Sequence, residues 1–166
     1  MQSSAYKNEQ QLSGERVQIV SFSLGSEEYG VDISQVQEII RMVEITHVPR
    51  APHFMEGVIN LRGQLIPIID LRTRFGMPRA DQTKSTRIVV TEIGSKRVGI
   101  VVDAVSEVLN IPLENVENAP DMIAGVGTEY IQGVGKVGER LIILLDLTMV
   151  MSAEEKGQLE TAELAG

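Results

Sequence analysis

Two segments of equal length repeat almost the same pattern, and this repeat is the feature that most restricts the fold. GVINLRGQLIPIIDL runs from Gly57 to Leu71, and GVGKVGERLIILLDL runs from Gly133 to Leu147. At an offset of 76 positions they share Gly-Val at the start, Leu-Ile in the middle and Asp-Leu at the end. Each segment is typical of two short apolar strands folded back on each other, and only the first has an arginine, Arg62, at the bend.

A second pair of matching segments lies upstream, at an offset of 69 positions. GVDISQVQEII (30–40) aligns with GIVVDAVSEVL (99–109). Chance similarity between hairpins built from the same few apolar residues is the alternative, but the shared order and similar offsets favour a duplication. Half of such a chain cannot bury its apolar face alone. Two small barrels that share an interface would bury it, and closing each sheet would remove its exposed strand edges.

Alternating apolar and polar residues predict that strands dominate between the two ends of the chain. QIVSFSL (18–24) alternates with the period of two that a half-buried strand requires. RIVVTEI (87–93) and RVGIVV (97–102) flank a turn at Gly94-Ser95 and predict a hairpin. Aromatic residues make up only 4% of the chain, so we expect an aliphatic core. The fold class predicted is mainly β with one or two short helices.

One helix is predicted after the first strands. Asp32 occupies the position of an N-cap, and Gln35 follows with capping-box spacing. Apolar residues then recur at helical spacing through Val36 and Ile39, with an indistinct end near Met42. A shorter analogue is predicted over 103–109.

Charge and composition exclude several classes of function. With a net charge of −8, the chain has no basic face for nucleic acid, and an anionic membrane surface would repel it. There are no cysteines, and the longest apolar runs, such as LIILL at 141–145, are too short to cross a bilayer. We expect a cytosolic protein that does not insert into the membrane. Residues 1–15 predict a disordered tail, and 152–166 predict an acidic one.

No motif in the sequence predicts catalysis or cofactor binding. GVGKVG (133–138) matches G-x-G-x-x-G, but a strand rather than a helix follows it, so its glycines are expected in a hairpin. Asp70 and Asp146 each end an apolar strand, and turn capping explains them better than acid–base chemistry.

A metal site is also unsupported. His47 and His53, with Glu44 or Glu56 as a further ligand, could form one on paper, but they lack a recognised zinc spacing.

Arg62 is the side chain that the turn itself does not explain. In N-L-R-G-Q, Gly63 supplies the permissive backbone, and the repeat places Gly138 opposite Arg62. The arginine would therefore meet a carboxylate, either Glu38 within the chain or one on a partner protein, unless it is only a solvated surface residue.

Taken together, the chain resembles the CheW-type chemotaxis coupling proteins over roughly residues 16–151. The resemblance rests on VSFSLGSEEYGVDISQVQEII, VPRAPHFMEGVINLRGQLIPIIDLRTRFG, TRIVVTEIGSKRVGIVVDAVSEVL and the closing GERLIILLDL. It implies two intertwined SH3-like β-barrels over a shared aliphatic core, and no enzymatic activity. The alternative is a small β-barrel that binds a small molecule or acts as an enzyme.

The same resemblance implies the partners and the place of action. Such proteins bridge the cytoplasmic tips of methyl-accepting chemoreceptors and the regulatory domain of the histidine kinase CheA. The receptor tip would dock between the barrels and the kinase on barrel ends, in the cytoplasm beside membrane-bound receptor arrays. Val36 and Ile39 are partner-binding candidates that core packing would explain equally well. The residues expected at, or shaping, the partner interface are Val36, Glu38, Ile39, Gly57, Asn60 and Arg62.

Overall fold

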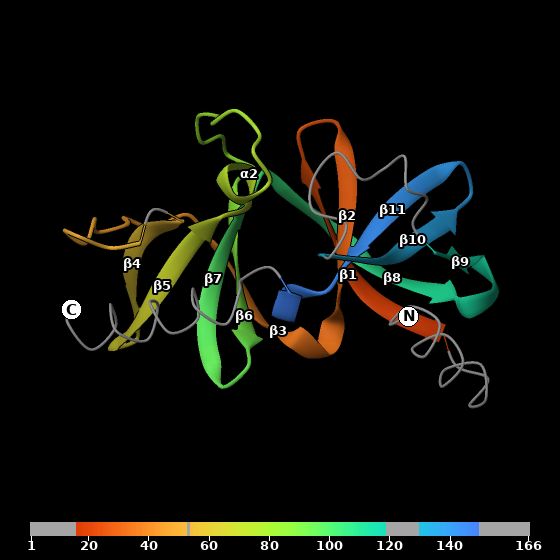
Figure 1. The fold of residues 1–166 in the computed structure, drawn as a ribbon, viewed down its shortest axis with the longest axis horizontal. Coiled ribbons are helices and arrows are strands. Elements are labelled where there is room, and N and C mark those ends of the chain that lie inside the picture. Colours follow the sequence, from red (N-terminus) through yellow and green to blue (C-terminus); the bar gives the residue numbers. More distant parts are fainter. Residues whose placement is uncertain (1–15, 53, 119–129, 150–166) are drawn as a thin grey trace.

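The computed structural model describes residues 16–52, 54–118 and 130–149. The predicted tails over 1–15 and 152–166 lie outside these residues. Figure 1 shows two curled sheets side by side, which confirms the predicted mainly β fold class. Within the described stretches, no helix has the length and apolar character needed to cross a membrane.

We call the two sheets the terminal barrel and the central barrel. The terminal barrel has the strand order β8-β1-β2-β11-β10-β9, and the central barrel has the order β3-β6-β7-β5-β4. The terminal barrel contains β1 (Arg16–Leu24), β2 (Glu27–Asp32), β8 (Ala104–Pro112), β9 (Val116–Glu117), β10 (Ile131–Val137) and β11 (Arg140–Leu145). The central barrel contains β3 (Val36–Arg41), β4 (Met55–Leu61), β5 (Gln64–Asp70), β6 (Arg87–Ile93) and β7 (Lys96–Val102).

Each sheet is closed by the segment that follows its edge strand. In the central barrel, the chain after β3 reaches β4, where Thr46 and Val58 exchange backbone hydrogen bonds of 2.8 and 2.9 Å. In the terminal barrel, the 3-10 turn η2 (Leu113–Asn115) leads from β8 into β9, which pairs with β10. Closure satisfies backbone groups that an open edge would leave unpaired.

The two barrels are built from equivalent strands of the two sequence repeats, and each barrel takes strands from both. The parallel pair β5–β7 places Ile68 opposite Gly99, and the parallel pair β11–β2 places Leu144 opposite Gly30. These are equivalent positions at the offsets of 76 and 69. Bulges also recur at equivalent places, after Met55 in β4 and after Ile131 in β10. Such matching registers are what a duplication with exchanged strands would produce.

A large apolar cluster lies between the barrels, and a smaller one fills each barrel. The shared cluster is mostly aliphatic, yet the described aromatic residues gather there, with four rings in contact between Phe22 and Tyr130. Inside the terminal barrel, Ile19 and Ile142 are buried, and inside the central barrel, Ile68 is buried. The barrels therefore fold against each other rather than as separate beads.

The predicted helix from Asp32 to near Met42 is wrong. The Asp32 carboxylate does accept a hydrogen bond from the Ser34 N–H at 2.9 Å, but it caps only the 3-10 turn η1 (Ile33–Gln35). The chain then continues as β3, whose residues alternate between partly buried and exposed. The analogue over 103–109 is wrong for the same reason, because it forms β8 along β1. Pairing with β6 and β1 satisfies backbone groups that a helix would otherwise satisfy internally.

Two aspartates cap turns at the ends of equivalent strands, as predicted. Asp70 Oδ1 accepts a hydrogen bond from the Arg72 N–H at 2.9 Å, at the start of the short helix α2 (Leu71–Arg74). Asp146 Oδ1 accepts one from the Thr148 N–H at 3.0 Å, at the start of the 3-10 turn η5 (Leu147–Met149). The glycines of GVGKVG lie in β10 and its turn, so this motif does not open a helix.

Candidate functional site

The turn between β4 and β5 presents Arg62 in a conformation unusual for arginine. Its φ is +53°, in the left-handed region, and the equivalent Gly138 has φ +61°. Glycine adopts this backbone freely, whereas a side chain there is sterically disfavoured. Asn60 fixes the turn, because its Oδ1 accepts a hydrogen bond from the Gly63 N–H at 2.8 Å. The fold therefore tolerates an arginine where its own repeat uses glycine.

Arg62 reaches from the turn to Glu38 on β3, across the mouth of the central barrel. Its Nη1 and Nη2 donate to the two carboxylate oxygens of Glu38 at 2.9 and 2.5 Å, a bidentate geometry. The Arg62 side chain is 65% exposed and that of Glu38 is 26% exposed. The hydrogen bonds from Arg62 hold the pKa of Glu38 below its usual range, and the charge of Arg97 adds to this effect. Of the alternatives for Arg62, the structure supports pairing with Glu38.

A hydrogen-bond network surrounds this pair and joins four strands. Arg97 on β7 donates from Nε to Gln37 Oε1 on β3 at 2.7 Å, and from Nη1 to Gln64 Oε1 on β5. Gln37 donates in turn to Glu92 on β6 at 2.9 Å. The sequence reasoning missed these residues, because their proximity depends on strand register.

The apolar candidates on β3 lie on the side of the sheet that faces the other barrel. Ile39 pairs with Val89, which is buried in the shared cluster, and side chains of paired residues point to the same face. Ile39 is nevertheless 40% exposed, because β3 is the last strand of its sheet. Val36 is partly buried and packs against the shared cluster.

Gly57 is buried and has a structural role in closing the barrel. A Cβ on this residue would meet the Thr46 carbonyl oxygen at 2.3 Å and the Ile45 Cγ2 at 2.8 Å. A side chain here would push the closing segment away from β4. Any effect of Gly57 on a partner would therefore act through the shape of the barrel.

Other exposed apolar residues occupy equivalent places in the two barrels. Val108 on β8 is the equivalent of Ile39 and is 50% exposed. Leu65 on β5 and Leu141 on β11 are also equivalent and exposed. The sequence repeat predicts that these residues are equivalent, because Ile39 and Val108 are 69 positions apart and Leu65 and Leu141 are 76 positions apart.

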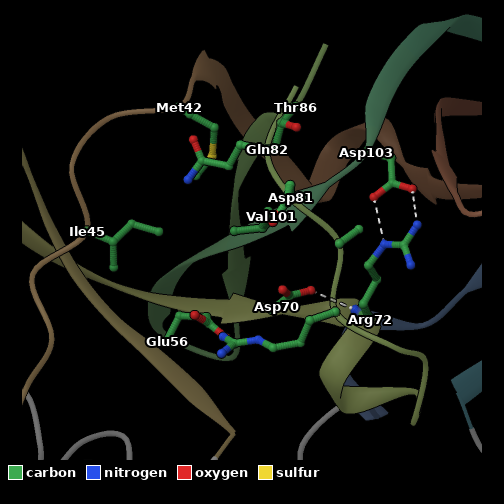
Figure 2. A pocket seen from close by; sticks show the side chains of 12 residues that line it. Met42, Ile45, Glu56, Asp70, Arg72, Asp81, Gln82, Thr86, Val101 and Asp103 are labelled. Carbon is green, nitrogen blue, oxygen red and sulfur yellow. Dashed lines mark hydrogen bonds and ion pairs between the residues drawn. The ribbon is translucent and has the colours of Figure 1, made fainter. Parts of the chain in front are cut away.

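A polar cavity of about 370 Å³ lies at the opposite end of β5 from the Arg62 turn. Figure 2 shows Asp70 directed into it from one side, with Met42 and Ile45 on another wall. Both of its arginines are paired, Arg72 with Asp103 and Arg79 with Glu56. Burial raises the pKa of Asp70. In the described part of the chain, no three histidine or acidic side chains are grouped to hold a metal, and His53 of the histidine pair lies outside it.

Comparison with known proteins identifies the family of the chain. The profile of the CheW-like domain matches residues 18–155. Chemotaxis protein CheW of Klebsiella aerogenes is 43% identical over 146 residues, covering 87% of this chain and 88% of that protein. The corresponding protein of Treponema pallidum is 35% identical over 148 residues, with 87% of each chain covered.

A solved structure shows the same fold. The crystal structure of the scaffolding protein TtCheW from Thermoanaerobacter tengcongensis superposes with a TM-score of 0.77 at 38% identity, covering 84% of this chain and 90% of that one. The chain therefore belongs to the CheW-like domain family, as a chemotaxis scaffold protein and not an enzyme.

Proposed function

We propose that this protein couples chemoreceptors to a CheA-type histidine kinase, with β3 of the central barrel as the receptor-binding element. The observation that carries the proposal is the bidentate Arg62–Glu38 pair, which spans the barrel mouth from a strained turn. The equivalent turn of the terminal barrel has Gly138 in place of the arginine. A feature present in one copy of a duplicated scaffold suits a partner that meets one barrel and not the other.

The apolar part of the receptor contact is proposed at the inter-barrel face. Ile39 and Val36 lie on the face of β3 that borders the shared cluster, where a helical receptor tip would place apolar side chains. Glu38 lies between them in sequence and is held by Arg62 on the other face of the strand. The pair would thus fix the edge strand in position while its opposite face binds the receptor.

The kinase contact is proposed at an exposed barrel end. Leu65 and Leu141 are apolar, exposed and placed at equivalent starts of β5 and β11. Large exposed apolar side chains are typical anchors for a partner surface. The regulatory domain of the kinase would cover one of these two leucines, together with the polar side chains at the same end of that barrel.

The test measures the two contacts separately. Binding to the isolated kinase regulatory domain is followed by calorimetry for the wild type, Leu65→Glu and Leu141→Glu. Recruitment into receptor complexes is followed by co-sedimentation with receptor cytoplasmic fragments for Ile39→Glu and Arg62→Gly. Glycine is used at position 62 because it keeps the turn conformation that Gly138 adopts.

We expect one leucine variant to lose kinase binding, and Ile39→Glu and Arg62→Gly to lose receptor recruitment while keeping kinase binding. Val108→Glu is the matched control for Ile39→Glu, since it places the same charge at the equivalent exposed position of the terminal barrel. Normal recruitment of Ile39→Glu, or equal loss in both variants, would argue against β3 as the receptor element. Kinase binding by both leucine variants would move that contact elsewhere.

A further inference from the structure

The terminal barrel contains a complete ion-pair triad at the place where the central barrel has the Arg62–Glu38 pair. Arg140 on β11 donates from Nε and Nη2 to both oxygens of Glu28 on β2 at 2.9 and 2.6 Å. Its Nη1 donates to Glu107 on β8 at 2.9 Å. One arginine on a strand thus binds two carboxylates, and the nearby turn residue Gly138 has no side chain to contribute.

The central barrel has different residues at three of the four equivalent positions. Gln64 stands where the terminal barrel has Arg140, Arg97 stands where it has Glu28, and Arg62 replaces Gly138. Only the carboxylate is kept, as Glu38 in place of Glu107. The side chain of Gln64 accepts a hydrogen bond from Arg97. No strand arginine therefore takes both oxygens of Glu38, which are bound by Arg62 from the turn.

We infer that Gln64 and Arg97 are positioning residues that reserve Glu38 for Arg62. A glutamine at position 64 has no positive charge with which to bind Glu38. An arginine at position 97, hydrogen-bonded to Gln37 and Gln64, is held to the side of the carboxylate. The exchange of side chains between copies thus moves the arginine that binds Glu38 from a strand to the exposed turn.

The consequence is a difference between the two barrel mouths. In the terminal barrel, the triad satisfies its carboxylates within the sheet. In the central barrel, the equivalent carboxylate, Glu38, binds Arg62. The Arg62 side chain is thus held in one direction while it remains 65% exposed. This part of the inference rests on the proposed function, in which only the central barrel uses such a pair to hold its receptor-binding strand, β3, in position.

The test converts the central network into the terminal one with Gln64→Arg and Arg97→Glu together. The pKa of Glu38 is followed by NMR titration of its carboxyl carbon, with and without Arg62→Gly. In the otherwise wild-type chain, Arg62→Gly should raise the pKa of Glu38, because hydrogen bonds from Arg62 are the main cause of its lowering. In the exchanged chain, Arg62→Gly should leave that pKa unchanged, because the new strand arginine binds Glu38. An equal rise in both backgrounds would overturn the inference.

The matched control is Ser95→Arg with Lys96→Glu, which makes the same change of net charge in the adjacent β6–β7 turn and the first residue of β7. It should keep the response of Glu38 to Arg62→Gly. If the exchanged chain fails to fold by circular dichroism, Gln64→Arg alone provides the competing arginine and should reduce the same response, whereas an undiminished response would overturn the inference.

Receptor co-sedimentation separates this inference from the proposed function. We expect the exchanged chain to lose recruitment as Arg62→Gly does, and the control to keep it. If Arg62→Gly itself is recruited normally, the proposed role of Arg62 fails, while the NMR result still decides which arginine binds Glu38. If Arg62→Gly is not recruited but the exchanged chain is, the functional part of the inference is wrong.

Discussion

At the scale of single residues, an informative difference between the two barrels is a buried position where the terminal barrel has a serine and the central barrel has a valine. Ser21 is fully buried in β1, and its hydroxyl is the one buried side-chain oxygen or nitrogen in the described residues without a hydrogen-bond partner. The equivalent residue in β6 is Val90, which packs inside the central barrel. A buried hydroxyl without a partner is destabilising, because it has lost its hydrogen bonds to water.

We therefore predict that Ser21→Val stabilises the protein by about 1 kcal/mol, since it removes the orphaned hydroxyl and buries added methyl groups. Urea unfolding measures the change in the free energy of unfolding. Ser21 lies opposite Gly30 in the strand register, as Val90 lies opposite Gly99, so the space around both residues is similar.

Thr91→Val is the control for this prediction. The Thr91 hydroxyl is also buried but donates to the Val98 carbonyl at 3.0 Å, so its removal should destabilise the protein by about 1 kcal/mol. A loss of stability in Ser21→Val would show that the barrel interior cannot accept the added volume.

The candidate site shows what single residues can reveal before a structure is known. Arg62 stands out in the sequence because a tight turn does not require an arginine. Glu38 then stands out because a carboxylate that pairs with this arginine would explain it. Gln64 and Arg97 do not stand out, because a glutamine or arginine on a strand is ordinary. Their hydrogen bonds beside Glu38 depend on the register of four strands, which the local sequence does not specify.

At the scale of elements, one error in the sequence interpretation occurs twice because the repeat occurs twice. Val36–Arg41 and the equivalent stretch of β8 both place a glutamate among apolar residues. In β3, Glu38 lies on the same side as Ile40, opposite buried Val90, so apolar and polar residues do not alternate in the sequence of the strand although its burial does. The glutamate is accepted there because Arg62 binds it at the barrel mouth. The bulge after Val36 further disturbs the period of two that predicts a strand.

The capping aspartate of α2 gives a prediction about pH. Burial is the main cause that raises the pKa of Asp70, above the ordinary value of 3.8. An acid whose pKa is raised by folding stabilises the fold most below 3.8, and this contribution is lost as the pH rises through the folded pKa. Asp70→Asn keeps an oxygen that can cap the helix. It should therefore be more stable than the wild type at neutral pH, and this advantage should disappear in acid.

Asp103 provides the opposite case within the same cavity. It accepts hydrogen bonds from Arg72 at 2.9 and 2.6 Å and from the Gly25 N–H at 2.7 Å, and the bonds from Arg72 are the main cause that lowers its pKa. Its stabilising contribution is present above 3.8 and is lost as the pH falls through the lowered folded pKa. Asp103→Asn should be destabilised at neutral pH. Thermal unfolding of both variants from pH 3 to 7 checks the two signs, and parallel curves would contradict the assignment.

At the scale of the whole molecule, the exchange of strands makes the barrels interdependent. β1 and β2 precede the central barrel in sequence but lie in the terminal one, while β6 and β7 follow the first repeat and complete the central one (Figure 1). The Arg72–Asp103 pair and the Gly25 N–H add a polar connection between α2 and the β1–β2 turn. The repeat in the sequence predicts two barrels and a shared core. It does not predict which strands are exchanged, because equivalent strands have nearly equal apolar patterns.

This arrangement predicts how a cut chain behaves. A protease site inserted after Ala80, in the exposed segment between α2 and β6, divides the molecule between its two repeats. The first fragment then has β1 to β5, and neither barrel is complete within it. We expect the cleaved protein to remain folded and to elute as one species, because both barrels and the shared cluster hold the fragments together.

After denaturation and separation, neither fragment should unfold cooperatively on its own, and mixing them should restore the β-sheet circular dichroism signal. Each lone fragment leaves strand edges and the apolar residues of the shared cluster exposed to water, so it cannot bury enough surface to offset its conformational entropy. The uncut insertion variant controls for the added residues. A fragment that folds alone would show that one repeat can pair its own strands into a barrel, and exchange would then be one of two stable arrangements rather than a requirement of the fold.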